Sequence, residues 1–324
     1  MKSCDVVGLG YCSYDYLAVV PQRPEFDADT QSLADFATDG GGPVSTALVA
    51  LARLGARTAY IGVLGDDAHG QALGAMFAAE GVDCTRLRWA AGCHSQVCVI
   101  LVEQRTGRRS ILCHRPNCPS PALDDADFAL VASARALHLD GHHMYDAIQA
   151  AQFARSRGIL VSLDANRPRE GLGQLLPHVD LLIASGPFAS AFTGLKDPSE
   201  AAEILHRIGP RIVVVTQGER GCIWVSEGER GTSPGFPVKA VDTTGAGDAF
   251  HGAFLFGHLK GWPLAQSAEF ANAVAAINCT RLGGRSGLPT LPRVIQFLRE
   301  RSPNCAAWDS LTAEIAENAG EMEN

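Results

Sequence analysis

Apolar runs of strand length alternate with apolar patterns of helical period along most of the chain. The first four segments are, in order, CDVVGLG, PVSTALVALARLG, TAYIGVLG and AHGQALGAMFAAEG. Further apolar runs of strand length are ALHLDG, GILVSLDAN, VDLLIAS and RIVVVTQG. Strands and helices in this alternation form βαβ units, whose strands lie parallel in one sheet. The pattern therefore predicts an α/β fold with a mainly parallel central sheet flanked by helices.

The first helical segment has the clearest signals. Gly42 precedes it, and Pro43 stands in its first turn, where the missing N–H of proline costs nothing. One face carries apolar residues at helical spacing, namely Val44, Ala47, Leu48, Leu51 and Leu54. We expect this helix to be buried against the sheet.

The later strand runs indicate where a ligand would bind. Three of the four end in small or polar residues. A parallel sheet places its ligand-binding edge at the carboxyl ends of its strands. We expect the functional site along that edge.

Two segments, residues 11–39 and 92–113, interrupt the alternation with shorter and more polar β-like runs such as VEQRTGRRSILC. They predict a small accessory sheet outside the main one. Beyond Pro303 the chain becomes acidic and poor in apolar residues. We therefore expect one domain over residues 1–303, followed by an acidic tail over 304–324 that is either helical or disordered.

Composition excludes several classes of function. The chain has 324 residues, 46% of them hydrophobic, a net charge of −8 and a pI of about 5.7, with lysine and arginine scattered. Nucleic-acid and anionic-membrane partners are not expected from such a charge distribution. Because the sequence has no signal-peptide pattern and no apolar run near ~18 residues, we expect a cytoplasmic protein. The ten cysteines are then expected to be reduced thiols.

The segment VDTTGAGDAF, residues 241–250, combines acidic residues, threonines and glycines directly before an apolar helix pattern. Its glycines allow a ligand to approach the backbone, and the unpaired N–H groups of the helix start would bind an anion. A carboxylate at a helix start is also stabilising by itself, by ~0.3–1 kcal/mol. Capping does not require the flanking glycines, so we favour a catalytic role for Asp248, which would accept a hydroxyl proton beside a bound phosphoryl group.

These residues resemble a known family. DTTGAGDAF is similar to the second signature of the ribokinase-like (PfkB) carbohydrate kinases, and GGGPVSTALVALARLGARTAYIGVLGDDAHG, residues 40–70, is similar to the first. The resemblance covers about residues 4–300. It implies a ribokinase-like fold with a β-sheet lid over the sugar, ATP and Mg²⁺ as donor and metal, and phosphorylation of a small sugar. VVVTQGERGCIW and CTRLGGRSGLP look closest to sulfofructose kinases, and VSLDANRPREGL resembles ketohexokinases.

Position by position, the resemblance implies a catalytic and a nucleotide-binding group. Asp248 takes the place of the general base, and the backbone of Gly245, Ala246 and Gly247 takes that of the anion hole. The nucleotide-binding positions are Thr216, Gly218, Gly221 and Asn272.

Further positions match sugar and cation contacts. Asp15, Gly41 and Gly42 match residues that hold sugar hydroxyls, and Thr46 stands where many members have a sugar-binding asparagine. Asp242, Thr244 and Ser286 match a monovalent-cation site, so K⁺ is a candidate activator. The family's Asn-x-x-Glu motif, which organises Mg²⁺, is replaced here by Ser185-Gly186-Pro187-Phe188. Mg²⁺ would then be held mainly by ATP phosphates and water.

The charge of the substrate follows from three further positions. Sulfofructose kinases hold their sulfonate with a lysine, an asparagine and an arginine, where this chain aligns Thr30, Cys113 and His142. None of these is a permanent cation, and a desolvated anion needs charged donors. We therefore expect a neutral ketose, bound in part by Cys113 and His142. A nucleoside kinase of the same fold and a non-catalytic sugar or nucleotide sensor stay open as alternatives. The family resemblance also implies a homodimer through the lid.

Two other motifs suggest different ligands, a dinucleotide and zinc. GLGYCS, residues 8–13, approaches the dinucleotide fingerprint but has Ser13 in place of the third glycine, and no helix pattern follows it. CHSQVC and CHRPNC repeat a Cys-His-x-x-x-Cys spacing that zinc could use. Strand alternation would send each adjacent Cys and His to opposite faces, so we expect no stoichiometric zinc.

Overall fold

A computed structural model of the chain describes residues 3–27, 30–306 and 308. Most of the predicted acidic tail, residues 309–324, lies outside the described residues. Trp308, just before that limit, is fully buried and packs against Trp262 and Phe270.

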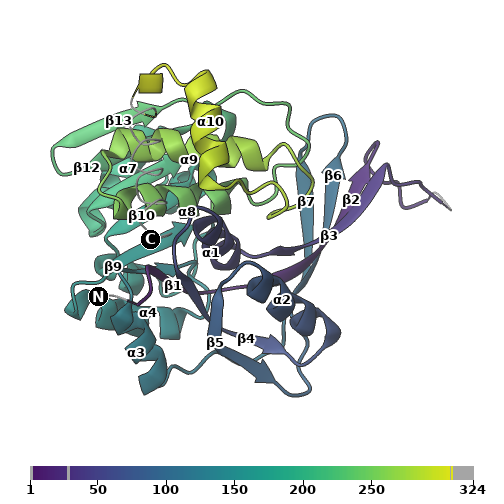
Figure 1. Cartoon of the computed structure of the whole chain (residues 1–324), viewed down its shortest axis with the longest axis horizontal. Coiled ribbons are helices and arrows are strands. Elements are labelled where there is room, and N and C mark those ends of the chain that lie inside the picture. Colours follow the sequence, from purple (N-terminus) through teal and green to yellow (C-terminus); the bar gives the residue numbers. More distant parts are fainter. Residues whose placement is uncertain (1–2, 28–29, 307, 309–324) are drawn as a thin grey trace, which may run out of the picture.

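Nine strands in the described part of the chain form the large sheet (Figure 1). The first two neighbouring pairs in the order given next are antiparallel, and every other neighbouring pair is parallel. In spatial order the strands are β13 (Glu229–Ser233), β12 (Cys222–Ser226), β11 (Ile212–Thr216), β10 (Leu181–Ser185), β9 (Leu160–Ala165), β8 (Ala136–Leu139), β1 (Val6–Leu9), β4 (Thr58–Gly65) and β5 (Asp83–Ala90).

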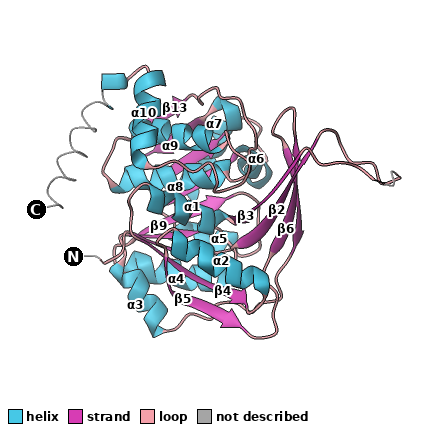
Figure 2. Ribbon diagram, turned by 45° about the vertical axis from the view of Figure 1, so that its right-hand side comes forward, coloured by secondary structure: helices cyan, strands magenta, loops and turns pink. Residues whose placement is uncertain are grey.

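Four described strands form a second, smaller sheet that projects to one side of the main body (Figures 1 and 2). In spatial order they are β3 (Asp35–Gly41), β2 (Ser13–Val20), β6 (Val97–Glu103) and β7 (Arg109–His114). The strands come from the two segments that interrupt the sequence pattern, and they run slightly beyond the predicted ends, to Gly41 and His114. The expected fold class, a mainly parallel sheet flanked by helices with a small separate sheet, is confirmed.

Helices cover both faces of the large sheet (Figure 2). One layer contains α1 (Pro43–Arg53), α2 (Ala68–Ala79), α8 (Ala246–Leu259), α9 (Leu264–Asn278) and α10 (Leu291–Arg301). The other contains α3 (Asp125–Ser133), α4 (Met144–Ser156), α5 (Leu172–Leu175), α6 (Gly186–Thr193) and α7 (Pro198–Ile208). Alternate strand residues face the two layers, so Val6 packs with the first and Val7 with the second.

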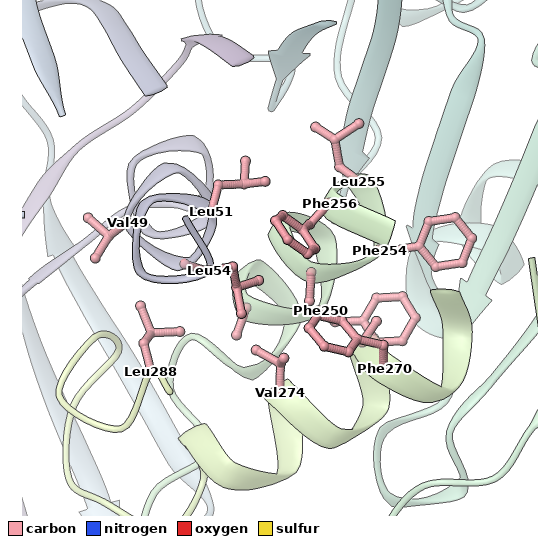
Figure 3. Close-up of a cluster of buried hydrophobic side chains, with 14 of the residues drawn as sticks. Val49, Leu51, Leu54, Phe250, Phe254, Leu255, Phe256, Phe270, Val274 and Leu288 are labelled. Atoms are coloured by element: carbon pink, nitrogen blue, oxygen red, sulfur yellow. The ribbon is translucent and has the colours of Figure 1, made fainter. Parts of the chain in front are cut away.

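The core beneath the first layer is formed where α1, α8 and α9 pack together (Figure 3). The apolar face predicted for α1 is buried there, because Val44, Ala47, Leu48, Leu51 and Leu54 are each at most 2% exposed. Phenylalanines of α8 and α9 fill the space opposite. This packing holds the first turn of α8 at the carboxyl edge of the large sheet.

No helix in the described residues is long and apolar enough to cross a membrane.

Candidate active site

The loop before α8 positions Asp248. Gly245 caps the helix with a φ of 71°, in the left-handed region that favours glycine. A Cβ there would meet the carbonyl oxygen of Gly284 at 2.5 Å, so a larger residue would separate two loops that touch. Around Gly247 the space is open within 4 Å. The backbone of Gly247 is therefore uncovered on the side where a Cβ would stand, and Asp248 follows it in the same turn.

Asp248 carries an unusual carboxyl. Burial raises its pKa to about 6, although the nearby charges of Arg109 and Arg285 act in the opposite direction. The charge of Asp248 in turn raises the pKa of the nearby Asp15 and Asp164 carboxyls. At neutral pH such a group is mostly ionised, and its proton affinity suits transfer near that pH.

Asp242 ties the α8 loop to the loop over residues 283–287. Its Oδ1 accepts hydrogen bonds from the Thr244 N–H at 2.8 Å and the Thr244 hydroxyl at 2.7 Å, and its Oδ2 accepts from the Gly283 N–H at 3.0 Å. The Ser286 hydroxyl donates instead to Asp39 Oδ2, at 3.0 Å. Of the three predicted cation ligands, Asp242 and Thr244 lie together, and the Ser286 side chain is directed to Asp39.

Asp15 lies on β2 and is 3% exposed. Its Oδ1 accepts a hydrogen bond from the Ser13 hydroxyl at 2.7 Å, and burial raises its pKa to about 7. A Cβ on Gly41 would overlap the Asp15 carboxylate, so only glycine lets the two strands bring this group to the backbone. Gly42 follows at the start of α1. The structure thus brings together Asp15, Gly41 and Gly42, as the sequence predicted.

Arg285 is buried beside Gly41 and Thr46. It is 3% exposed, and its guanidinium packs over the Phe77 ring at 5.2 Å. Nη2 donates to the Gly41 carbonyl at 2.9 Å, and Nε donates to the Thr46 hydroxyl at 3.4 Å. Thr46 therefore serves as a partner for this arginine. Among the described residues, Nη1 of Arg285 has no hydrogen-bond partner although it is buried.

His142 follows β8 and stacks on Tyr11, with ring centroids 3.8 Å apart. Its Nδ1 lies 3.0 Å from Asp140 Oδ1, and Asp140 Oδ2 accepts from the Tyr11 N–H at 2.8 Å. Burial alone would raise the pKa of Asp140. The His142 imidazole and the two backbone N–H donors outweigh burial and hold that pKa at about 2. A permanently ionised Asp140 thus fixes the Tyr11–His142 stack.

The small sheet places one row of side chains in register with Asp15. Asp39 lies opposite Asp15 on β3, Cys98 lies beside Asp15 on β6, and Cys113 lies opposite Cys98 on β7. Partners in register point to the same face of a sheet. Cys113, the predicted substrate contact, is therefore on the same face as Asp15, with Cys98 between them.

The tip of the small sheet holds the loop before α8. Thr243 donates through its N–H and its hydroxyl to the Gly107 carbonyl, at 3.2 and 3.1 Å. Arg109 Nη1 donates to the Thr243 hydroxyl at 2.8 Å. We call these contacts the lid clasp. They bring a cation from the small sheet next to the segment that contains Asp248.

The predicted nucleotide residues lie around the end of β11. Thr216 ends that strand, and a short 3₁₀ turn over Gly218–Arg220 follows. A cavity of about 340 Å³ is lined here by Thr216, Gly218 and residues 185–187. The cavity therefore joins the turn predicted to bind the nucleotide to the segment that replaces Asn-x-x-Glu.

Asn272 on α9 lies at the edge of β13. Its Nδ2 donates to the carbonyls of Ser233 and Pro234 at 3.1 and 3.2 Å, and to the Ser233 hydroxyl at 3.0 Å. The side-chain amide is therefore committed to holding the chain after β13 in place. Gly221, between the 3₁₀ turn over Gly218–Arg220 and β12, packs against the same segment.

The described residues contain no group of three or more His, Cys, Asp or Glu side chains placed to hold a metal ion. Ser185, at the start of α6, uses its hydroxyl to accept the Phe188 N–H at 3.2 Å, as an ordinary helix cap. The His94 and His114 rings of the two Cys-His motifs stack at 4.4 Å. The side chains of the described residues therefore do not assemble a magnesium cage, and a metal ion held here would need nucleotide phosphates and water as further ligands.

Several charged groups near Asp248 are not predicted as site residues by the sequence. Arg285 lies in the GGRSG loop, and its motif was the only signal available. Asp164 lies one residue before the end of β9, and its Oδ2 is 3.4 Å from His251 Nδ1. Burial raises the pKa of Asp164 well above its ordinary value, and the charges of Asp248 and Asp140 add to that rise. Arg109 and Asp164 become recognisable only when the fold brings them to Asp248.

A carboxylate in the first turn of a helix, with the carboxylates of Asp15 and Asp39 on the small sheet nearby, is an arrangement suited to a phosphotransferase acting on a small hydroxyl compound. The model of the pfkB family carbohydrate kinases matches residues 3–291, and the chain belongs to this family.

The chain is similar to characterised members. It is 28% identical over 297 residues to the ribokinase of Haemophilus influenzae, covering 90% of this chain and 97% of that protein. It is 28% identical over 287 residues to fructokinase-1 of Zea mays, covering 81% of this chain and 88% of that protein. The fold matches that of Arabidopsis thaliana ribokinase, solved with ribose and ATP, at a TM-score of 0.78 and 24% identity, covering 91% of this chain and 99% of that chain.

Proposed function

We propose that the protein transfers the γ-phosphoryl group of ATP to a hydroxyl of a neutral ketose, with Asp248 as the general base. The observation that carries this proposal is the placement of Asp248 in the first turn of α8, beside the left-handed Gly245 and the open space at Gly247. A carboxylate used only as a helix cap would not need that space. The raised pKa, about 6, fits a base that works near neutral pH.

The reaction needs few protein groups. Asp248 accepts the proton of the sugar hydroxyl while the oxygen of that hydroxyl attacks the γ-phosphorus. The bond from the γ-phosphorus to the bridging oxygen of ADP breaks in the same in-line displacement. The N–H groups of Gly245 and Gly247 would donate to the phosphoryl oxygens, joined by that of Ala246 once it leaves the Thr243 carbonyl, to which it donates at 3.3 Å. Their positions are set before the reaction, because Gly245 packs on Gly284 and Asp242 ties the two loops together.

The donor would lie along the end of β11. The cavity lined by Thr216 and Gly218 is open to the segment Ser185–Pro187, and we assign the nucleotide to it. We infer that Mg²⁺ arrives on the ATP phosphates, since the described residues provide no cluster that would hold the ion without them. K⁺ at Asp242 and Thr244 is a further proposal, and it would depend on backbone carbonyls more than on Ser286.

The ketose would occupy the face formed by Asp15, Gly41, Cys113 and the Tyr11–His142 stack. The likeness to a fructokinase supports a ketose. A neutral substrate is supported by the charge balance, because Arg115 and Arg169 act on Tyr11 together with the carboxylate of Asp140, and Arg169 also acts on Asp164. A sulfonate or phosphate would have to compete with those carboxylates for the same cations.

We further propose a homodimer in the cytoplasm, formed through the outer face of the small sheet. Phe36, Val99 and Leu112 are 54%, 40% and 58% exposed there, and Val99 lies directly opposite Leu112. Apolar side chains gathered on one exposed sheet face favour contact with a second copy of the same face.

A screen of ATP turnover by the purified protein tests the substrate. It should include neutral ketoses, aldoses, sugar acids, hexose phosphates, 6-deoxy-6-sulfofructose and nucleosides, compared by kcat/KM. We expect a neutral ketose to be the best substrate. A sulfonated or phosphorylated sugar that is turned over at least as well as every neutral sugar would refute the pocket assignment.

Two other results of the screen would change the class of function. A nucleoside as best substrate would make the protein a nucleoside kinase. Binding of sugar or ATP without any turnover would make it a sensor.

A further inference from the structure

Two cysteines face each other across the small sheet. Cys98 on β6 and Cys113 on β7 are direct partners in the antiparallel register, and their Sγ atoms lie 2.9 Å apart. Directly opposite residues of antiparallel strands have Cα atoms ~4.5–5.5 Å apart, which lies inside the ~4.4–6.8 Å range of disulfides. A bond between these sulfurs therefore requires no change in the strand pairing.

The two thiols differ in exposure. Cys113 is exposed, whereas Cys98 is 3% exposed and packs with Leu17, Ile100 and Val102. Burial raises the pKa of the Cys98 thiol, and the neighbouring Cys113 and Asp15 add to that rise. An exposed thiol that reacts first and a buried thiol that resolves the product make an asymmetric pair suited to exchange with a small molecule.

The position of the pair links it to the pocket. Cys98 is the register partner of Asp15 on β2, so the pair continues the row that begins with Asp39 and Asp15. Closing the gap from 2.9 Å to the ~2.05 Å of a disulfide shifts one or both sulfurs in the row next to Asp15. Displacements of ångström scale at a reacting site cost up to about 10²-fold in rate.

We propose that Cys98 and Cys113 are a modification site, a dithiol on the substrate-facing side of the small sheet that a small-molecule disulfide of the glutathione class oxidises reversibly. The Cys113 thiolate attacks one sulfur of the oxidant and releases one small thiol, leaving a mixed disulfide. Cys98 then gives up its proton and attacks the Cys113 sulfur, which expels the second small thiol. Two protein thiols are oxidised, and one small disulfide is reduced to two thiols.

A second cysteine pair in the same part of the sheet supplies a control. Burial and, after it, the neighbouring Cys93 thiol raise the pKa of Cys118 to about 11. Cys93 precedes β6 and Cys118 follows β7, so both lie outside the paired strands, beyond the end at which Cys98 and Cys113 are paired. The proposal assigns the reversible bond to Cys98 and Cys113, so it should form without Cys93.

The bond is tested on the full chain, equilibrated in buffers of fixed ratios of oxidised to reduced glutathione, then quenched with acid, alkylated, digested and mapped by mass spectrometry. We expect a cross-linked peptide joining Cys98 and Cys113 in the oxidised buffers, absent in the reduced ones. Cys93→Ser should retain it, and Cys98→Ser and Cys113→Ser should each lose it. Glutathione attached to Cys113 beside an alkylated Cys98, or a cross-link only between Cys93 and Cys118, would overturn the proposal.

The effect on catalysis rests on the proposed function and is measured on the wild-type protein alone. Oxidation should lower kcat/KM for the best sugar by about 10–10²-fold and leave ATP binding unchanged, and dithiothreitol should restore it. A complete cross-link with unchanged kcat/KM would overturn the placement of the pair at the substrate face. A reversible cross-link in a protein without kinase activity in either state would refute the proposed function and leave the dithiol site standing.

Discussion

Asp15 and Asp248 both have carboxyl pKa values above the ordinary 3.8, at about 7 and about 6, because both groups are removed from water. A folded-state pKa above the unfolded value means that the folded protein keeps a proton which the unfolded chain has already released. The contribution of these two groups to stability therefore falls as pH rises from about 4 to about 7. These carboxylates are expected to weaken the fold at neutral pH while serving the site.

Asp15→Asn should separate these two effects. The amide keeps an acceptor for the Ser13 hydroxyl but carries no charge to desolvate. We expect Tm at pH 7.5 to rise by a few degrees, roughly 1–4 °C, and the difference from wild type to vanish below pH ~4. KM for the sugar should rise by about tenfold or more, since hydrogen bonds to a charged group are lost.

Differential scanning calorimetry across pH, together with sugar kinetics, measures both effects. Asp35→Asn, an exposed aspartate at the start of β3, is the matched control and should change neither. A lower Tm for Asp15→Asn at pH 7.5 would contradict the raised pKa.

The wild-type enzyme should lose activity on the acid side in the same window. Because Asp248 accepts a proton only when ionised, kcat/KM should fall as pH is lowered through about 7 to 6. Initial rates at saturating ATP and limiting sugar, from pH 5 to 8.5, measure the profile. A flat profile over that range would mean that neither carboxyl must be ionised for turnover.

The small sheet and the loop before α8 act on each other through the lid clasp. Arg109 donates to Thr243, and its charge lowers the pKa of Asp248 against the larger effect of burial. The clasp therefore connects the position of the small sheet to the proton affinity of Asp248.

Arg109→Ala should lower kcat by about tenfold and move the acid limb of the pH profile to higher pH, since the pKa of Asp248 rises when the cation is removed. The neighbouring Arg108→Ala removes a cation from the opposite face of the same hairpin and should leave the profile in place. Pre-steady-state and pH-rate measurements on both variants decide the matter. An unshifted acid limb in Arg109→Ala would rule out the electrostatic part of this account.

At the scale of elements, the sequence was informative where one periodicity applied. The buried strands β8 to β11 and the apolar face of α1 follow directly from the pattern. Strand β5 did not, because its sequence DCTRLRWA mixes charged and apolar residues at the edge of the sheet. The antiparallel pair β12 and β13 also broke the βαβ rule. Of the site, Asp248 and its glycines could be predicted from the motif. The burial of Arg285 and the position of Arg109 near Asp248 depend on contacts between segments far apart in the sequence. No local sequence pattern predicts such contacts.

For the whole molecule, the proposed dimer can be broken at one face. Leu112→Glu places a charge among exposed apolar side chains of the small sheet, and burying it without a partner is costly. Sedimentation velocity should show the wild type at twice the 34.2 kDa chain mass and the variant at the monomer mass. Ile204→Glu on α7, the same apolar-to-charged change at a partly exposed position, should remain dimeric. A monomeric wild type at micromolar concentration would refute the dimer.

The central claim is that Asp248 is the base of a carbohydrate kinase, and it is tested most directly by the turnover of Asp248→Asn. The control is Asp125→Asn, which makes the same change in the first turn of α3, where the carboxylate serves only the helix start. The account predicts that kcat with the best sugar falls by about 10²-fold or more in Asp248→Asn with ATP binding retained, and that Asp125→Asn turns over like wild type. Near-normal turnover by Asp248→Asn would contradict the account.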